Sequence, residues 1–128
     1  MRERLGEAFH ISGGWAVPQF IEALDRGVDA MVPESAMTTV YCDIDRTYRA
    51  GHRALAVQRF RRLLPILAFA NQEITLSIAF FKRLLVRKRI FSSATLRRPG
   101  FAWDRYNMRI ADELIDAYIQ LETELSTS

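Results

Sequence analysis

Cysteine and lysine are both scarce in this chain of 128 residues. The single cysteine, Cys42, excludes an internal disulfide and favours a reducing compartment, so we expect a cytoplasmic protein. Side-chain amines are present only at Lys82 and Lys88, because the other basic residues are arginines. Few groups are therefore available for chemistry that requires an amine.

Long apolar runs are also missing. The most apolar stretch, residues 63–81, is interrupted by polar residues and is too short to span a membrane. Residues 1–10 are charged and do not resemble a signal peptide. With 49% apolar and 26% charged residues, the composition is that of a globular domain, which excludes a disordered tail or a disulfide scaffold. The net charge of +3 is too small to imply a polyanionic partner by itself.

The beginning of the chain has the pattern of a βαβ unit. Residues 7–12 form a short apolar run that ends at two glycines, which predicts a buried strand. Residues 15–26 predict a helix ended by Gly27, and residues 28–32 predict a second strand. A strand, a helix and a strand in this order are typical of two parallel strands buried on both faces.

Helices are predicted from residue 36 onward. Thr38 or Thr39 is expected to cap a helix that runs to about residue 50, and the next helix, from His52, is expected to bend at Pro65. Residues 73–88 predict a further helix, and Asp104 is expected to cap the last one. Two parallel strands leave unpaired edges, so we expect the missing strands to come from another chain or from upstream of Met1.

Four segments resemble, in order, the C-terminal portion of one enzyme family. They are FHISG at residues 9–13, ALDRGVDAMV at 23–32, the Ala-Gly and Leu-Leu-Pro features within 48–65, and the lysine-to-Arg-Pro stretch within 82–99. With these segments, residues 3–121 resemble the dihydrodipicolinate synthase / N-acetylneuraminate lyase family. Its members are (β/α)8-barrel lyases and aldolases that work through a Schiff base.

The resemblance implies an α/β fold class: the last two strands of a TIM barrel within residues 7–36, then a mostly α-helical C-terminal extension within 37–125. Together they would form a single partial domain over 1–128. The family's Schiff-base lysine, tyrosine proton shuttle and carboxylate-binding turn would all precede Met1. The implied protein is the C-terminal fragment of a lyase acting on pyruvate or a related 2-keto acid, inactive alone, with no catalytic residue, metal or cofactor of its own. The implied partners are the keto acid in the complete parent, further copies of the chain, or the missing barrel portion.

Active sites of such barrels lie at the carboxyl ends of the strands. The candidate substrate-binding residues are therefore Ser12, Gly13, Gly14, Val32 and Glu34. The resemblance implies that the backbone carbonyl of Val32 faces the keto acid, and that Glu34 stands where some members place a substrate-contacting serine. A solvated loop residue is an equal alternative for Glu34. Gly14 and Trp15 stand where the family often has acidic residues that contact the acceptor, which favours a smaller or flatter acceptor than a polyol.

Two other functions are open at this point. The chain could be a non-catalytic helical module for oligomerisation, held together through its strand edges. Residues 82–98 contain seven basic residues and no acidic one, which is a weaker indication of a nucleic-acid or membrane surface. We expect neither partner, because the acidic last helix would offset this charge, and Lys82 is expected on a solvated helix face. His10 is expected to be a core histidine, and Cys42 a buried thiol.

Overall fold

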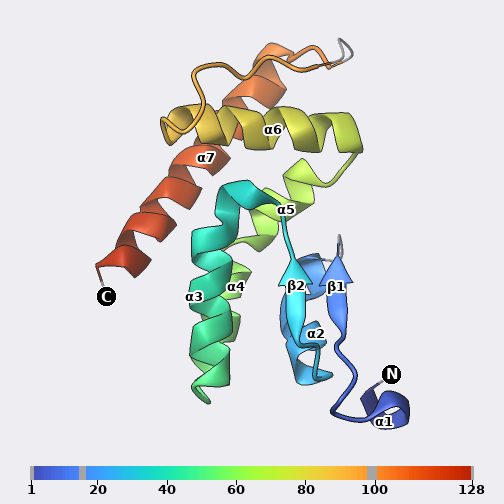
Figure 1. Ribbon diagram of the computed structural model, residues 1–128. Helices are drawn as coiled ribbons and strands as arrows, with labels where there is room; N and C mark the ends of the chain where they lie inside the picture. The colour runs from blue at the N-terminus through green and yellow to red at the C-terminus, as the bar shows by residue number, and fades with distance from the viewer. Residues whose placement is uncertain (1, 15–16, 98–100, 128) are drawn as a thin grey trace. The chain divides into compact units, whose positions relative to one another are not determined.

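The computed structural model describes residues 2–14, 17–97 and 101–127 (Figure 1). The chain divides into two compact units, residues 1–60 and residues 61–128. Each unit has its own buried side chains, and the two are described separately.

The first unit begins with a βαβ arrangement. Its elements are α1 (Arg2–Leu5), β1 (Ser12–Gly14), the 3-10 helix η1 (Val17–Gln19), α2 (Phe20–Asp25) and β2 (Ala30–Val32). The two strands pair in parallel, as the sequence predicted, with Ser12 opposite Ala30 and Gly14 opposite Val32. Gly27 has a φ of 75° and ends α2 in the left-handed conformation that glycine adopts without strain.

Three further helical elements complete this unit: η2 (Ser35–Met37), α3 (Thr38–Arg49) and α4 (Arg53–Arg61), the last residue of which belongs to the second unit. The Phe20 ring lies 5.3 Å from the Tyr41 ring and 5.9 Å from the Phe60 ring, measured between centroids. The core of the unit therefore joins α2, α3 and α4 through aromatic side chains. Fully buried Val40 and Ile44 extend it along α3.

The predicted position and burial of the first strand are wrong. The strand covers Ser12–Gly14 rather than residues 7–12, and both of these end residues are exposed. The apolar run of residues 7–11 instead lies at the surface, and only two short strands pair among the described residues. His10 is accordingly exposed rather than a core histidine. Cys42, predicted to be buried, is exposed on α3.

Two local predictions about helices also need correction. Thr38 does not cap α3: its hydroxyl donates to the Ser35 carbonyl, and no side chain caps this helix. Pro65 does not bend a continuous helix, because α4 ends at Arg61 and α5 begins again at Leu64. Proline fits the first turn of α5, where its missing N–H removes no helical hydrogen bond.

The second unit consists of α5 (Leu64–Ala70), α6 (Ile74–Arg87) and α7 (Arg105–Ser126). Carboxylates cap the two longer helices. Glu73 accepts hydrogen bonds from the amides of Thr75 and Leu76 at the start of α6, and Asp104 accepts from two amides at the start of α7, as predicted. Buried side chains from all three helices form the core, and the largest are Ile66, Leu67, Phe80, Leu84, Ile115, Tyr118 and Leu121.

Ion pairs fix the sense in which α6 and α7 cross. Arg83 pairs with Asp112, and one turn further along both helices Arg87 pairs with Asp116. The pairs advance together along the two helices, so α6 and α7 run in the same general direction rather than as a hairpin. The chain must therefore return along α6 before α7 begins (Figure 1), and Lys82 binds the returning segment by donating to the Thr95 carbonyl.

Acidic residues of the last helix pair with three residues of the basic stretch. Besides the two arginine pairs, Lys88 pairs with Glu122 at 2.7 Å, which confirms the expected compensation by acidic residues of α7.

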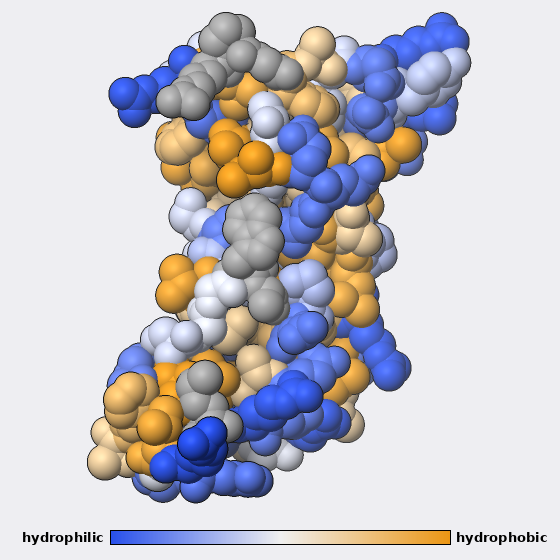
Figure 2. Space-filling model, turned by 90° about the vertical axis from the view of Figure 1, so that its right-hand side faces the viewer, coloured by the Kyte–Doolittle hydropathy of each residue, from blue (hydrophilic) through white to orange (hydrophobic). Residues whose placement is uncertain are grey.

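Figure 2 displays one face, on which apolar and charged side chains are interspersed. Among the described residues, no helix combines the length and the apolar character needed to cross a bilayer.

Candidate functional site

The structure places four of the five predicted site residues at the carboxyl-terminal end of the small sheet, whereas Ser12 begins β1 and pairs with Ala30, the first residue of β2. Gly13 pairs with Met31 and Gly14 with Val32, so the carboxyl ends of β1 and β2 are adjacent. Glu34 follows β2 by two residues, directly before η2. Val32 and Ser12 are exposed, and Val32 has 66% of its surface accessible. Trp15, the other residue singled out at this edge, lies outside the described residues.

Gly13 allows a side chain from the neighbouring strand to cross it. A β-carbon at Gly13 would lie 2.5 Å from the Met31 sulfur and 3.1 Å from its methyl group. Any larger residue there would push the flexible end of Met31 aside. Gly13 therefore leaves room for the Met31 side chain. Met31 also lines the groove between β2 and α3 that is described below.

Glu34 is the most perturbed group at this edge. Its side chain is largely buried, it forms no capping hydrogen bond at η2, and its Oε1 has no hydrogen-bond partner among the described residues. Burial disfavours the ionised form and raises the pKa of Glu34 to about 7. The carboxyl group can therefore accept or donate a hydrogen bond near neutral pH. The alternative of a solvated loop residue does not fit this burial.

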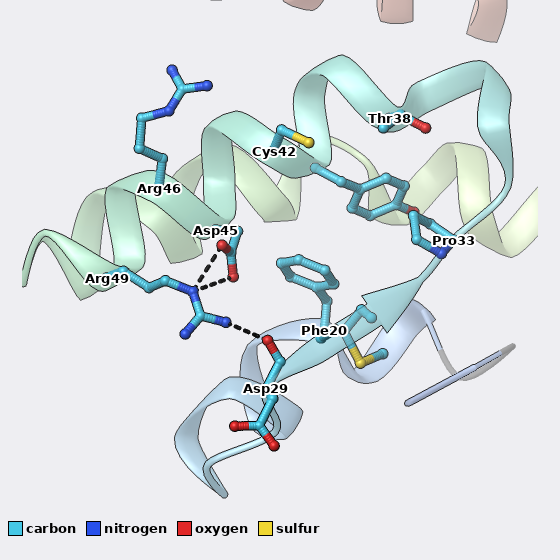
Figure 3. Close-up of a pocket in the computed structure, with 11 residues that line it drawn as sticks. Phe20, Asp29, Pro33, Thr38, Cys42, Asp45, Arg46 and Arg49 are labelled. Carbon is cyan, nitrogen blue, oxygen red and sulfur yellow. Dashed lines mark hydrogen bonds and ion pairs between the residues drawn. The ribbon is translucent and has the colours of Figure 1, made fainter. Parts of the chain in front are cut away.

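A groove of about 480 Å³ lies between β2 and α3 (Figure 3). Buried Phe20 and Tyr41 contribute apolar surface, and Met31 and Pro33 line the strand side. The α3 side presents one helix face, with spacings of three and four residues: Thr38, Tyr41, Cys42, Asp45, Arg46 and Arg49. The groove follows the edge of β2 that β1 does not occupy.

Arginine and aspartate residues hold the lower end of this groove together. Arg49 Nε donates to both oxygens of Asp45, at 3.0 and 2.8 Å, and Arg49 Nη2 donates to the Asp29 carbonyl at 2.9 Å. The Asp29 carboxylate accepts from the Ile11 amide and from Arg2, and these hydrogen bonds lower its pKa. The entry to β2 is thus bonded both to α3 and to the chain before β1.

Ser12 has a histidine neighbour that the sequence reading did not connect with it. His10 Nε2 and Ser12 Oγ lie 2.8 Å apart, whereas His10 Nδ1 is 4.0 Å from Asp29 Oδ2. The second distance is too long for the hydrogen bond that orients the histidine of a serine nucleophile. The pair therefore serves as a polar contact at the start of β1.

Both lysines belong to the second unit and are engaged there. Lys82 Nζ donates to the Thr95 carbonyl, and Lys88 is paired with Glu122, both within the second unit. Lys82 is half-buried rather than on a fully solvated face. Within the described ranges, no cluster of three potential metal ligands is present.

Sequence reasoning found the strand ends but missed the groove. The glycines and proline that end the apolar runs mark the carboxyl ends of the strands. The groove depends on which face of α3 meets β2, and the sequence offered only the helical spacing of Tyr41, Cys42 and Asp45 as a signal.

The chain was compared with protein families, curated proteins and solved structures. No protein-family model matches the chain, and no curated protein matches it. Among solved structures, a dihydrodipicolinate synthase from Rhodopseudomonas palustris matches with a TM-score of 0.77 and 21% identity. The chain has the fold of part of a dihydrodipicolinate synthase. The match covers 91% of this chain and 39% of the synthase chain, so the resemblance to this family is confirmed at the level of fold.

Proposed function

We propose that this chain is the C-terminal part of a Schiff-base-forming lyase or aldolase that acts on pyruvate or a related 2-keto acid. One observation carries the proposal: four of the five candidate residues, all but Ser12, lie at or just after the carboxyl ends of the strands in a parallel β1–α2–β2 unit, within a fold similar to part of dihydrodipicolinate synthase. In a TIM barrel, substrates bind at the carboxyl ends of the strands. The strands would be the last two of the barrel, and residues 37–125 its helical extension.

In this proposal the chain supplies one wall of the pocket, not the nucleophile. A Schiff base requires a desolvated lysine beside the substrate. Lys82 and Lys88 are engaged elsewhere, so the imine would form on a lysine of the missing barrel portion. Glu34 would hydrogen-bond a hydroxyl or amine of the substrate through its unpartnered Oε1, and the Val32 carbonyl would face the keto acid.

The groove beside β2 is the place where the barrel portion would join. A further parallel strand would pair with the open edge of β2 and lie against the apolar surface of Phe20, Met31 and Tyr41. Cys42 lines this groove, is exposed, and is the single cysteine of the chain. Its thiol is therefore a site-specific reporter of whether the groove is occupied.

The test mixes this chain with the synthase from R. palustris truncated before its last two strands. We expect the rate of Cys42 alkylation by iodoacetamide, followed by mass spectrometry, to fall at least tenfold in the mixture. Borohydride with pyruvate should label a lysine of the truncated synthase more in the mixture than alone, and should leave this chain unmodified. Labelling of Lys82 or Lys88, or an unchanged alkylation rate with no gain in labelling, contradicts the proposal.

Neighbouring threonines provide a matched pair of variants. Thr38 lines the groove and Thr39 does not, although both are exposed on the first turn of α3. Thr38→Arg should block association and restore rapid alkylation of Cys42. Thr39→Arg adds the same charge one residue away and should associate like the unchanged chain.

The open strand edge also supports a second candidate, a non-catalytic oligomerisation module. Val32 is exposed beside this edge, and unpaired strand edges promote association. This reading expects Cys42 to be protected in the chain alone, increasingly with its concentration, and sedimentation to detect oligomers. The barrel proposal instead requires the truncated synthase for protection.

A further inference from the structure

The end of α6 carries an arginine where the backbone favours glycine. Arg89 has a φ of 59°, and the other described residues with left-handed φ are all glycines, namely Gly6, Gly27 and Gly51. The Arg89 amide donates to the Val86 carbonyl and the Ile90 amide to the Leu85 carbonyl, both at 2.9 Å. This is the hydrogen-bond pattern of a helix end that glycine usually occupies. A β-carbon is strained there, so the role of Arg89 is to be sought in its side chain.

That side chain lines a cavity that is open to the surface, within the second unit. The cavity has a volume of about 440 Å³ and lies between the end of α6 and the middle of α7. Its lining contains three arginines and one carboxylate beside apolar surface: Arg83, Arg87, Arg89, Asp112, Val86 and Ile115. The lining itself therefore carries an excess of positive charge.

The three guanidinium groups differ in how far they are already engaged. Arg83 binds Asp112 through Nε and Nη2, at 2.7 and 2.8 Å, and Arg87 binds Asp116 through Nη2 at 2.6 Å. The guanidinium of Arg89, unlike its backbone amide, makes no hydrogen bond or ion pair with another residue in the described part of the chain. A guanidinium has five N–H donors, so Arg89 offers its whole fork and each of the other two retains donors.

We propose that this cavity binds the phosphate group of a small phosphorylated compound. The planar fork of Arg89 matches two phosphate oxygens, and the remaining donors of Arg83 and Arg87 reach the others. Half-buried Val86 provides apolar surface for the organic part of the ligand. A nucleic-acid strand fits less well, because Arg83, Arg87 and Lys88 are each paired with an acidic residue of α7 and leave no row of open cations.

The test measures binding of inorganic phosphate and phenyl phosphate to the full chain by calorimetry. The decisive variant is Arg89→Gly, because glycine suits the left-handed backbone and should leave the thermal midpoint unchanged or raised. We expect it to weaken binding of both probes at least tenfold, and phenyl phosphate to bind the unchanged chain more tightly than inorganic phosphate. Arg89→Lys keeps the charge but loses the two-pronged guanidinium. Its affinity for both probes should lie between that of the unchanged chain and that of Arg89→Gly.

Arg61→Gln is the matched control, since it removes one positive charge from an exposed position of the same unit that does not line the cavity. It should bind phosphate as the unchanged chain does. The proposal is overturned if neither probe binds, if Arg89→Gly binds as tightly as the unchanged chain, or if Arg61→Gln loses as much affinity. Displacement of phosphate by single-stranded oligonucleotides, with affinity that rises with their length and falls steeply with salt, would overturn it in favour of a polymer-binding surface. The outcome is independent of the barrel proposal, which rests on the first unit.

Discussion

Glu34 should make the stability of the chain fall as pH rises from 4.5 to about 7. Its carboxyl group has a pKa of about 7 in the folded chain and an ordinary value of 4.5 when exposed, because burial disfavours the charge. Between these two pH values the folded chain binds more protons than the unfolded chain, so the stabilisation is complete below pH 4.5 and lost as pH rises through about 7. The difference between the two values corresponds to about 3 kcal/mol at most.

The perturbation is Glu34→Gln, which keeps the shape of the side chain and removes its ionisation. Urea unfolding from pH 5 to pH 9, with hydrogen exchange over residues 30–42 as the local readout, should give a smaller loss of stability with rising pH for this variant. Glu22→Gln makes the same change at an exposed position of α2 and should keep the pH dependence of the unchanged chain. Identical slopes for Glu34→Gln and the unchanged chain would refute the assignment of a buried, unpartnered carboxyl group.

Three further predictions concern stability. Leu84→Ala, at a fully buried position of α6, should lower the free energy of urea unfolding by about 2–5 kcal/mol. Ile78→Ala, on the exposed face of the same helix, should lower it by less than about 0.5 kcal/mol. Equal losses for the two variants would contradict the described core. Asp104→Ala should lower the free energy of unfolding by about 1 kcal/mol, and Asp104→Asn by much less, because asparagine keeps a capping oxygen. Thermal unfolding of the chain, followed by circular dichroism, checks this difference. Equal losses for the two variants would count against the cap. The hydrogen bond from Arg53 lowers the pKa of Asp25 to about 2. Asp25→Asn should therefore destabilise the chain at neutral pH, and the difference in stability from the unchanged chain should fade as pH falls through about 2. A stability difference that stays constant during acid unfolding would be inconsistent with this pair.

Features set by neighbouring residues could be predicted from the sequence. Gly27 and Gly51 end α2 and α3 with positive φ, and Asp104 caps α7, because each depends on a few backbone groups close by in the chain. The parallel pairing of the two strands was also predictable, since a strand, helix and strand in close succession leave few other arrangements.

Features that depend on distant packing could not be predicted. An apolar run such as residues 7–11 looks like a buried strand whether or not other strands cover it, so the burial expected for His10 was wrong. Cys42 lies on a side of α3 that its helical periodicity does not distinguish from the core side, and it faces the groove. At the site, glycines marked the strand ends, whereas the burial that perturbs Glu34 depends on packing that a short motif does not contain.

The shared direction of α6 and α7 has a consequence for how the second unit folds. A helical hairpin can close from its turn, with its first contacts between residues only a few positions apart. Here the Arg83–Asp112 and Arg87–Asp116 pairs each join residues 29 positions apart, and the chain must first return along α6. The entropy of closing that loop is lost before the helices interact, which raises the contact order and slows folding. The second unit should therefore fold more slowly than an antiparallel helical hairpin of equal length and stability.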